Sequence, residues 1–145
     1  MDTVTPERRS ENMRAIASKN TSPEIRVRKA LHRRGIRFRL HVAGLPGRPD
    51  VVMQASRICV FVHGCFWHGC TRCVDGRRAV RSNHEFWTLK IDRNRRRDAS
   101  QARRLRGAGW RVFVVWECQT ARAQSLQRFV SRLVSARQAQ LVSRG

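Results

Sequence analysis

Hydrophobic side chains recur along this chain with two periods, and each period predicts one kind of secondary structure. A spacing of three or four residues predicts helices, whereas alternation or a short unbroken apolar run predicts strands. Helices are expected over residues 7–18, 21–34, 84–106 and 121–140, and strands over residues 36–40, 50–53, 58–62 and 110–116. The helix before the fourth strand is long enough for a crossover. We therefore expect one α/β domain over residues 1–145, a mixed β-sheet with helices on both sides.

The helix expected over residues 21–34 has recognisable signals at both ends. Thr21 and Glu24 have the spacing of a capping box, in which both side chains bond to backbone N–H groups of the first turn. Pro23 suits that turn because its missing N–H needs no partner there. Gly35 is placed to end the helix in the left-handed conformation.

The strand patterns also predict burial. Over residues 36–40 apolar residues alternate with basic ones and the alternation ends on His41, which predicts a solvent-facing side that includes this histidine. Residues 58–62 form an unbroken apolar run, which predicts burial on both faces. The run 112–115 predicts a buried centre for the last strand as well.

The net charge of +21 indicates a class of partner. Lys and Arg total 31 against 10 Asp and Glu in 145 residues. Arg binds phosphate oxygens with two parallel hydrogen bonds, so nucleic acid is the expected partner. No window approaches the roughly 18 apolar residues of a membrane span, and the polar N-terminus has no apolar signal region. We expect a cytoplasmic protein that associates with the nucleoid through DNA and has no membrane partner.

The cysteines predict a metal site. Cys65, Cys70 and Cys73 lie within nine residues, and Cys118 directly follows an expected strand. Thiolates at such spacing suit tetrahedral Zn²⁺, and four sulfur ligands leave no open position, so the zinc is interpreted as structural. The alternative is a set of unrelated thiols. Cys59, inside a strand, is expected in the core.

One acid and two imidazoles form a candidate catalytic site. Asp50 begins a strand, His63 ends the next one, and His68 lies in the cysteine-rich loop. A carboxylate can bind Mg²⁺ and a histidine can take a proton from water, which together fit phosphodiester hydrolysis. Asp98 can orient a histidine through a hydrogen bond. The alternative is that Asp50 caps a turn, the histidines are loop residues and Asp98 forms a surface ion pair.

Aromatic residues stand beside the basic surface at two places. Phe66 and Trp67 directly follow the first loop cysteine, and Phe86 and Trp87 begin the long helix. Aromatic side chains can wedge between bases and unstack them, although most belong to a hydrophobic core. The loop around Phe66 and Trp67 offers little with which to build a core.

Several short motifs of this chain form one pattern: Asn12–Ile16, Glu24, Leu45–Asp50, His63–His68, Glu85–Lys90 with Asn94 and Asp98, Gly109–Val112 and Val115–Cys118. These motifs resemble those of the very-short-patch repair (Vsr) endonucleases over about residues 8–119. The resemblance implies a restriction-endonuclease-like fold and a Mg²⁺-dependent nick 5′ to the T of a T:G mismatch, the product of 5-methylcytosine deamination.

The resemblance also implies roles for the candidate site. Asp50 would be the central Mg²⁺ ligand, with the backbone carbonyl of Val62 as a further ligand. The family commonly has Thr where Val62 stands, and activity should survive this change because a main-chain oxygen holds the metal. In the zinc loop, Cys70 occupies a position that can be His, and one residue is added before Cys73.

Proton transfer and DNA contact are assigned in the same way. His68 would be the general base, supported by Asp98, with His63 and Glu24 assisting at the phosphate. An N-terminal arm, residues 1–20, would contact DNA, and a C-terminal helix over residues 120–145 gains no role from the resemblance. The residues implied in DNA contact are Met13 in the minor groove, Phe66, Trp67 and Trp87 as an intercalating wedge, and Lys90 and Asn94 in the major groove.

Two other functions remain open on the sequence alone. A non-catalytic, zinc-stabilised DNA-binding protein would need the charge, the aromatic residues and the cysteines, but would not need Asp50 together with His68. A general nuclease would cut matched duplex equally well. We expect a monomer, because one asymmetric mismatch does not call for two-fold symmetry. Family members also suggest mismatch-repair proteins as partners.

Overall fold

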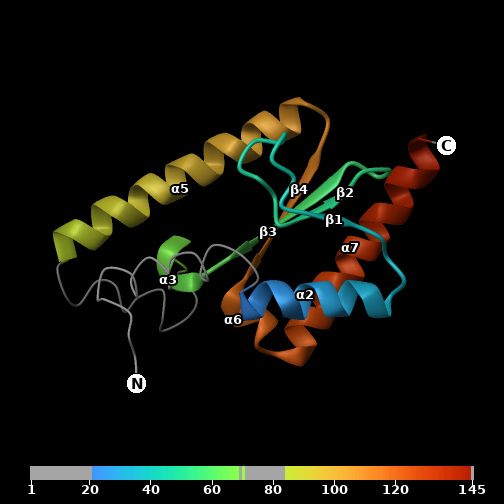
Figure 1. The fold of residues 1–145 in the computed structure, drawn as a ribbon, viewed down its shortest axis with the longest axis horizontal. Coiled ribbons are helices and arrows are strands. Elements are labelled where there is room, and N and C mark those ends of the chain that lie inside the picture. Colours follow the sequence, from blue (N-terminus) through green and yellow to red (C-terminus); the bar gives the residue numbers. More distant parts are fainter. Residues whose placement is uncertain (1–20, 69, 71–83, 145) are drawn as a thin grey trace, which may run out of the picture.

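The computed structural model describes residues 21–68, 70 and 84–144. The helix expected over residues 7–18, the arm over residues 1–20 with Met13, and Cys73 lie outside these residues. The elements are α2 (Ser22–Arg33), β1 (Arg39–Leu40), β2 (Val51–Met53), β3 (Ile58–His63), α3 (Cys65–His68), α5 (His84–Gly107), β4 (Arg111–Trp116), α6 (Glu117–Thr120) and α7 (Ala123–Arg144), as drawn in Figure 1.

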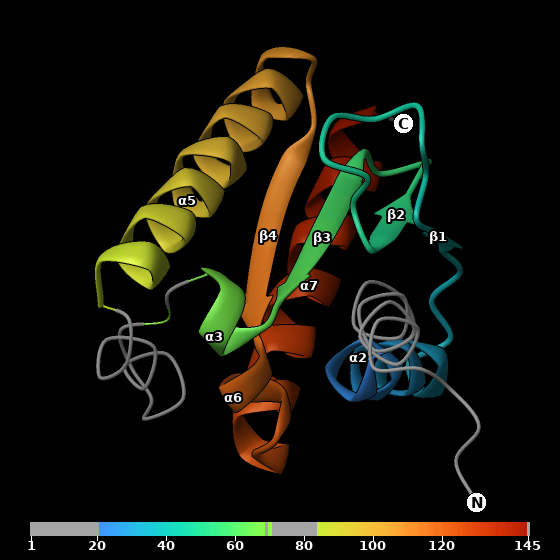
Figure 2. The ribbon, with the colours of Figure 1, turned by 60° about the vertical axis from the view of Figure 1, so that its left-hand side comes forward.

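The sheet is mixed, as its element order predicts. Its strands lie in the order β1-β2-β3-β4. The first three strands pair antiparallel, and β3 pairs parallel with β4, with Val60 opposite Phe113. The long helix α5 is the crossover between the two parallel strands. Because β3 and β4 run in the same direction, the helices that follow them, α3 and α6, lie at the same end of the sheet (Figure 2).

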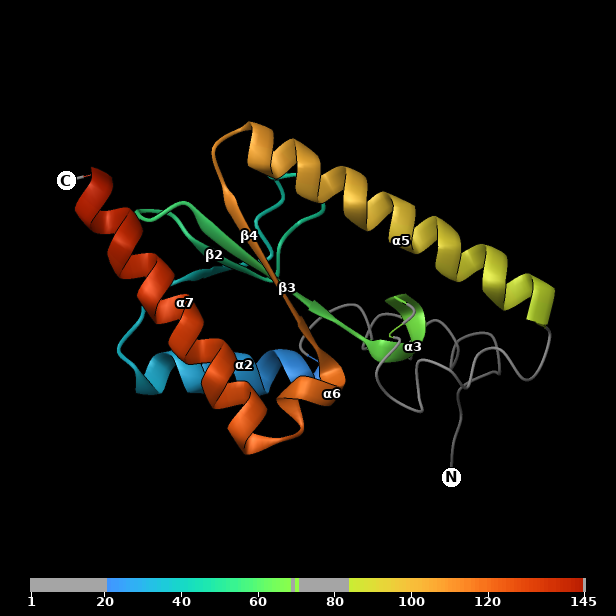
Figure 3. The same cartoon turned by 180° about the vertical axis from the view of Figure 1, so that it is seen from behind.

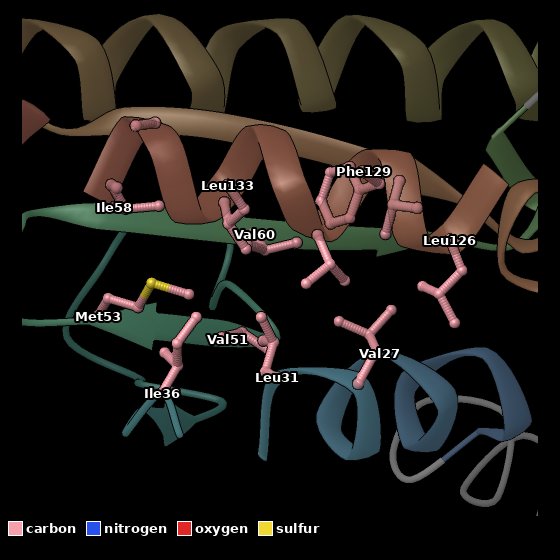
Figure 4. Packing of buried hydrophobic residues seen from close by; sticks show 14 residues of the cluster. Val27, Leu31, Ile36, Val51, Met53, Ile58, Val60, Leu126, Phe129 and Leu133 are labelled. Atoms are coloured by element: carbon pink, nitrogen blue, oxygen red, sulfur yellow. The ribbon is translucent and has the colours of Figure 1, made fainter. Parts of the chain in front are cut away.

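Helices cover both faces of the sheet, which confirms the predicted layers. Helices α2 and α7 lie on one side and α5 on the other (Figures 2 and 3). Alternate residues of β3 supply the two cores: Ile58 and Val60 pack toward α2 and α7, while Cys59 and Phe61 pack with Leu105 of α5. Figure 4 shows the first core, with Val27, Leu31, Ile36, Val51, Met53, Ile58, Val60, Leu126, Phe129 and Leu133 meeting between sheet and helices.

Burial of β3 on both faces confirms the reading of its apolar run, but the prediction for β4 is only partly right. Cys59 is fully buried, as expected for a core residue. In β4, Val115 is buried while Val114 remains 37% exposed. The reason is position: β4 is the last strand of the sheet and lies beside only one neighbour.

Two element boundaries and one helix cap differ from the prediction. Only Arg39 and Leu40 of the first expected strand pair with β2. The capping box of α2 is wrong, because the Thr21 side chain makes no cap hydrogen bond and Glu24 is buried against other partners. A short helix, α6, precedes the C-terminal helix, which begins at Ala123. Gly35 does adopt the left-handed conformation at the end of α2, with φ of 70°.

None of the described helices combines the length and the apolar composition needed to cross a bilayer.

Candidate active site and metal centre

Asp50 lies at the centre of the first cluster of polar side chains. It immediately precedes β2, and its Oδ2 accepts a hydrogen bond of 2.7 Å from the backbone N–H of Val62 on β3. Glu24 of α2, only 5% exposed, faces the same place. Burial raises the pKa of Asp50 to about 7, the Val62 hydrogen bond opposes this, and the charge of Glu24 adds to it.

His41 completes this cluster, and sequence reasoning missed it. The alternating pattern assigned His41 to a solvent-facing side, whereas its side chain is 22% exposed and lies between two acids. Its Nδ1 is 3.7 Å from Asp50 Oδ1, and its Nε2 is 3.7 Å from Glu24 Oε2. Antiparallel pairing of β1 with β2 brings His41 opposite Asp50, and no local pattern in the sequence reports that register.

His68 and Asp98 form the core of a second cluster. His68 Nδ1 lies 2.6 Å from Asp98 Oδ2, which joins α3 to α5. Burial works against ionisation of Asp98, but the hydrogen bond and the charge of His68 outweigh it, so the pKa of Asp98 lies below its usual value. An ionised Asp98 accepts a hydrogen bond from Nδ1–H of His68, so the lone pair of this imidazole is on Nε2.

His63 packs directly on this pair. The His63 and His68 rings stack with centroids 3.9 Å apart and an interplanar angle of 2°. Burial lowers the pKa of His63 to about 4, and a charge on His68 lowers it further, although Asp98 works in the opposite direction. His63 is therefore neutral at physiological pH. Trp116, at the end of β4, meets the His63 ring edge-on at 5.2 Å.

The two clusters are linked through adjacent residues of β3, since Val62 contacts Asp50 and His63 follows it. The first cluster offers two carboxylates that fit Mg²⁺, which prefers oxygen ligands. Burial is the main cause of the raised pKa of Asp50 and the charge of Glu24 adds to it, so a cation held here would favour the ionised form of Asp50. The arrangement combines two acids that could hold a cation with a histidine oriented by an acid.

Three of the four predicted zinc ligands meet at the end of the sheet. Metal-ligating atoms of Cys65, Cys70 and Cys118 all lie within 4.8 Å of one another. The Cys70 and Cys118 sulfurs are 3.9 Å apart, close to the edge of about 3.8 Å expected for a tetrahedron with Zn–S bonds of about 2.3 Å. The backbone N–H of Cys118 lies 3.4 Å from the Cys65 sulfur. These thiols therefore fit a zinc ion; the fourth predicted ligand, Cys73, lies outside the described residues.

The predicted DNA-contacting residues of the long helix share one face of α5. Trp87, Lys90 and Asn94 are spaced by three and four residues, which aligns their side chains along a helix. The Lys90 ammonium is 5.7 Å from the Trp87 ring centre. Nearby, Phe86 is 58% and Leu89 is 61% exposed. This end of α5 therefore presents apolar and basic groups to solvent.

Two predicted wedge residues are placed only in part. Phe66 and Trp67 belong to α3, directly before His68, and their side chains lie outside the described residues. Sequence reasoning also missed Glu117, whose Oε1 lies 3.3 Å from the backbone N–H of Cys65. This contact ties the beginning of α3 to the beginning of α6.

The chain is similar in sequence to known mismatch endonucleases and nicking enzymes. A family model described as "DNA mismatch endonuclease Vsr" matches residues 1–74. The chain is 46% identical over 126 residues to "Type II nicking enzyme V.XorIIP" of Xanthomonas oryzae, covering 87% of this chain and 91% of the relative. It is 46% identical over 110 residues to "DNA mismatch endonuclease Vsr" of Escherichia coli, covering 76% and 69%. To "Type II nicking enzyme V.NmeAIP" of Neisseria meningitidis it is 39% identical over 133 residues, covering 92% and 94%. The chain therefore belongs to the Vsr family of DNA mismatch endonucleases.

Proposed function

We propose that this endonuclease nicks one strand 5′ to the T of a T:G mismatch, the product of 5-methylcytosine deamination, in a Mg²⁺-dependent hydrolysis on a restriction-endonuclease-like fold. One observation carries the proposal: the His68–Asp98 contact of 2.6 Å stands beside the cluster around Asp50. A protein that only binds DNA has no need for this combination. The site residues support hydrolysis in the following roles.

Asp50 and the backbone carbonyl of Val62 would hold Mg²⁺, with Glu24 close by. When bound, the cation supplies positive charge that stabilises charge developing on the phosphate. The Val62 N–H holds one oxygen of Asp50 in place. Because the contact to Val62 is made through the backbone, Val at this position is compatible with the role.

His68 would act as the general base. Asp98 accepts a hydrogen bond from Nδ1–H of His68, so Nε2 can take a proton from the attacking water. His63, held neutral by burial, can donate a hydrogen bond to a phosphate oxygen. Stacking of the two rings restricts the orientation of both imidazoles.

DNA recognition would use the exposed end of α5 together with the segments before it. We assign Lys90 and Asn94 to the major groove, and Trp87 to an intercalating wedge together with Phe66 and Trp67. Met13 and the arm over residues 1–20 would reach the minor groove. The exposed apolar surface around Phe86 and the net charge of +21 support contact with unstacked bases and phosphates.

Zinc would hold the loop after β3 to the start of α6. With Cys73 as the fourth ligand beside Cys65, Cys70 and Cys118, the zinc would be enclosed by thiolates and would have a structural role. We further propose that the protein acts as a monomer on DNA in the cytoplasm and cooperates with mismatch-repair proteins.

Strand-resolved cleavage of end-labelled duplexes tests the proposal. A T:G duplex and the matched T:A duplex, in several cytosine-methylation contexts, are incubated with Mg²⁺ or with EDTA. We expect one nick, 5′ to the mismatched T, with Mg²⁺ only. Asp50→Asn should abolish the nick and retain DNA binding, because the change removes a negative charge near the phosphate.

Asp92→Asn is the matched control, because Asp92 is a half-exposed carboxylate on α5 that pairs with Arg96. It should nick at the wild-type rate. Equal cutting of T:G and T:A duplexes would instead assign a general nuclease. Binding without cutting in every context would assign a non-catalytic DNA-binding protein.

A further inference from the structure

His41 combines two features that the proposed function does not use. Its backbone adopts the left-handed region, with φ of 48°, and its imidazole lies between the carboxylates of Glu24 and Asp50. Non-glycine residues rarely adopt this φ, and such strain clusters at functional sites. We propose that His41 is a positioning residue for the Asp50 carboxylate and that Arg28 fixes which ring nitrogen of His41 carries the proton. The inference rests on the proposed role of Asp50 in holding the cation.

Arg28 determines the tautomer through a simple rule of hydrogen bonding. Arg28 Nη2 lies 3.1 Å from His41 Nε2. A guanidinium can only donate, so Nε2 must be the acceptor and carries no proton. A neutral His41 therefore carries its proton on Nδ1, the nitrogen that faces Asp50 Oδ1 at 3.7 Å. Arg28 is in turn held by Glu24, whose Oε2 accepts a hydrogen bond of 3.2 Å from the same Nη2.

The backbone of His41 contributes to the same placement. Its N–H donates to the carbonyl oxygen of Asp50 at 3.4 Å, directly beyond the Leu40–Val51 pair of β1 and β2. The left-handed turn at His41 then directs the side chain toward the acids rather than to the solvent side predicted by alternation. The left-handed backbone and the partly buried imidazole therefore both place Nδ1 of His41 toward Asp50.

The two oxygens of Asp50 consequently have different neighbours. Oδ2 accepts from the Val62 N–H, and Oδ1 faces the protonated Nδ1 of His41. These neighbours limit rotation of the carboxylate. Neither ring nitrogen of His41 offers a free lone pair, since Nδ1 carries the proton and Nε2 accepts from Arg28. His41 therefore orients a ligand of the cation and is not itself a ligand.

The tautomer can be observed directly by NMR. Long-range ¹H–¹⁵N spectra of the metal-free protein at pH 8 report which nitrogen of each neutral histidine is protonated, and comparison with His41→Asn assigns the His41 signals. We expect the Nδ1–H form in the wild type. Arg28→Met keeps the length of the side chain without the donor and should shift His41 toward the Nε2–H form. An Nε2–H form in the wild type, or no change in Arg28→Met, would overturn the proposal.

Three substitutions at His41 distinguish the contribution of the imidazole from that of the left-handed backbone. His41→Gly relieves the left-handed strain and removes the side chain, whereas His41→Asn tolerates this backbone and keeps a donor near the place of Nδ1. His41→Ala removes the side chain and keeps the strain. His32→Asn, on the exposed part of α2, is the matched control. Mn²⁺ affinity without DNA, measured by electron paramagnetic resonance, and nicking at saturating Mg²⁺ are the two readouts.

We expect His41→Asn and His32→Asn to keep wild-type Mn²⁺ affinity within about threefold, and His41→Gly and His41→Ala to lose about 10-fold to 100-fold, as for other groups that orient metal ligands. High Mg²⁺ should recover part of the nicking rate. If His41→Gly had the same Mn²⁺ affinity as His41→Asn, His41 would have only a backbone role and the proposal would be overturned. A wild type that binds Mn²⁺ without nicking would overturn only the proposed function, and one that binds no Mn²⁺ would overturn both.

Discussion

Asp98 Oδ2 lies 2.6 Å from Nδ1 of His68, although the two residues are 30 positions apart and belong to different helices. Helix α5 runs along the sheet from the end near α3, so its middle brings Asp98 to the residue that ends α3 (Figure 2). The acid and the imidazole together define which nitrogen of His68 is available for chemistry.

Asp98→Asn should slow nicking strongly. The amide can present N–H groups to Nδ1, which favours the tautomer with its proton on Nε2 and blocks that nitrogen as a base. We expect single-turnover nicking of a T:G duplex to fall by about 100-fold or more, in the range that general base catalysis contributes. Affinity for the duplex, measured by fluorescence anisotropy, should be retained. Asp92→Asn is again the control, and an Asp98→Asn protein that nicks at the wild-type rate would rule out the pair as the base.

The arrangement of layers was predictable from sequence because it depends on local patterns. The unbroken apolar run 58–62 indicates a strand buried on two faces, and a long helix before the next strand indicates a parallel crossover. Asp50 stands directly before one apolar run, His63 directly after another, and His68 in the loop that follows. These positions allowed the three residues to be proposed as one site. Cys118 was identifiable on the same ground.

Long-range pairing explains what the sequence did not reveal. His41 enters the site only through the register of β1 on β2 and a left-handed backbone, and neither has a local signal at a histidine. Glu24 is different because its partner is local: it accepts a hydrogen bond from Arg28 one turn along the same helix, and the Thr21 side chain makes no cap hydrogen bond. The partial exposure of β4 follows from its place at the edge, which apolar composition does not report.

Zinc content should depend on Cys118 and not on Cys59. Cys118 lies with Cys65 and Cys70, whereas Cys59 is buried in the core, where burial raises its thiol pKa to about 12. We expect about one zinc per chain in the wild type and in Cys59→Ala, and none in Cys118→Ser, by colorimetric assay after denaturation. Cys118→Ser should also lower Tm by about 10 °C or more, because the native state loses the zinc that stabilises it. Each kcal/mol of lost unfolding free energy lowers Tm by about 2–4 °C in a chain of this size. Zinc retained in Cys118→Ser would contradict the assignment.

Gly47 should be the least replaceable of three glycines in the α2–β2 region. Its φ is 76°, and an added Cβ would lie 2.6 Å from Gln101 Oε1 and 3.1 Å from Cε1 of the Phe61 ring. The end of Gln101 can move away, but the buried Phe61 ring has little room. Gly47→Ala should therefore cost more than the roughly 1–2 kcal/mol of left-handed strain alone.

Two other glycines are matched controls for Gly47. Gly35 shares the positive φ of 70° with open space around its Cβ position, so Gly35→Ala isolates the strain. Gly44 has neither feature, and Gly44→Ala should be near neutral. Urea unfolding at equilibrium should rank the losses of unfolding free energy as Gly47→Ala, then Gly35→Ala, then Gly44→Ala. A loss for Gly47→Ala no larger than that for Gly35→Ala would mean that Phe61 and Gln101 move to accommodate the added methyl group.

The raised pKa of Asp50 makes the stability of the metal-free protein depend on pH. The native state holds a proton on Asp50 up to about pH 7, whereas the unfolded chain releases it near 3.8. The stability from this group is fully present below pH 3.8 and is lost as pH rises through 7. Asp50→Asn keeps a neutral side chain, so its Tm relative to wild type should rise between pH 5 and pH 8.

The difference between the two proteins isolates Asp50, because His63, whose pKa is about 4, titrates in both. Adding Mg²⁺ at pH 8 should raise the Tm of the wild type and leave that of Asp50→Asn unchanged, since a cation that binds only the native state stabilises it. Asp92→Asn, which keeps the Asp50 carboxyl, is the control and should follow the wild-type curve. Parallel curves for wild type and Asp50→Asn from pH 5 to pH 8 would mean that the Asp50 carboxylate is already compensated without a cation, and that Arg28, rather than a metal, balances the two acids.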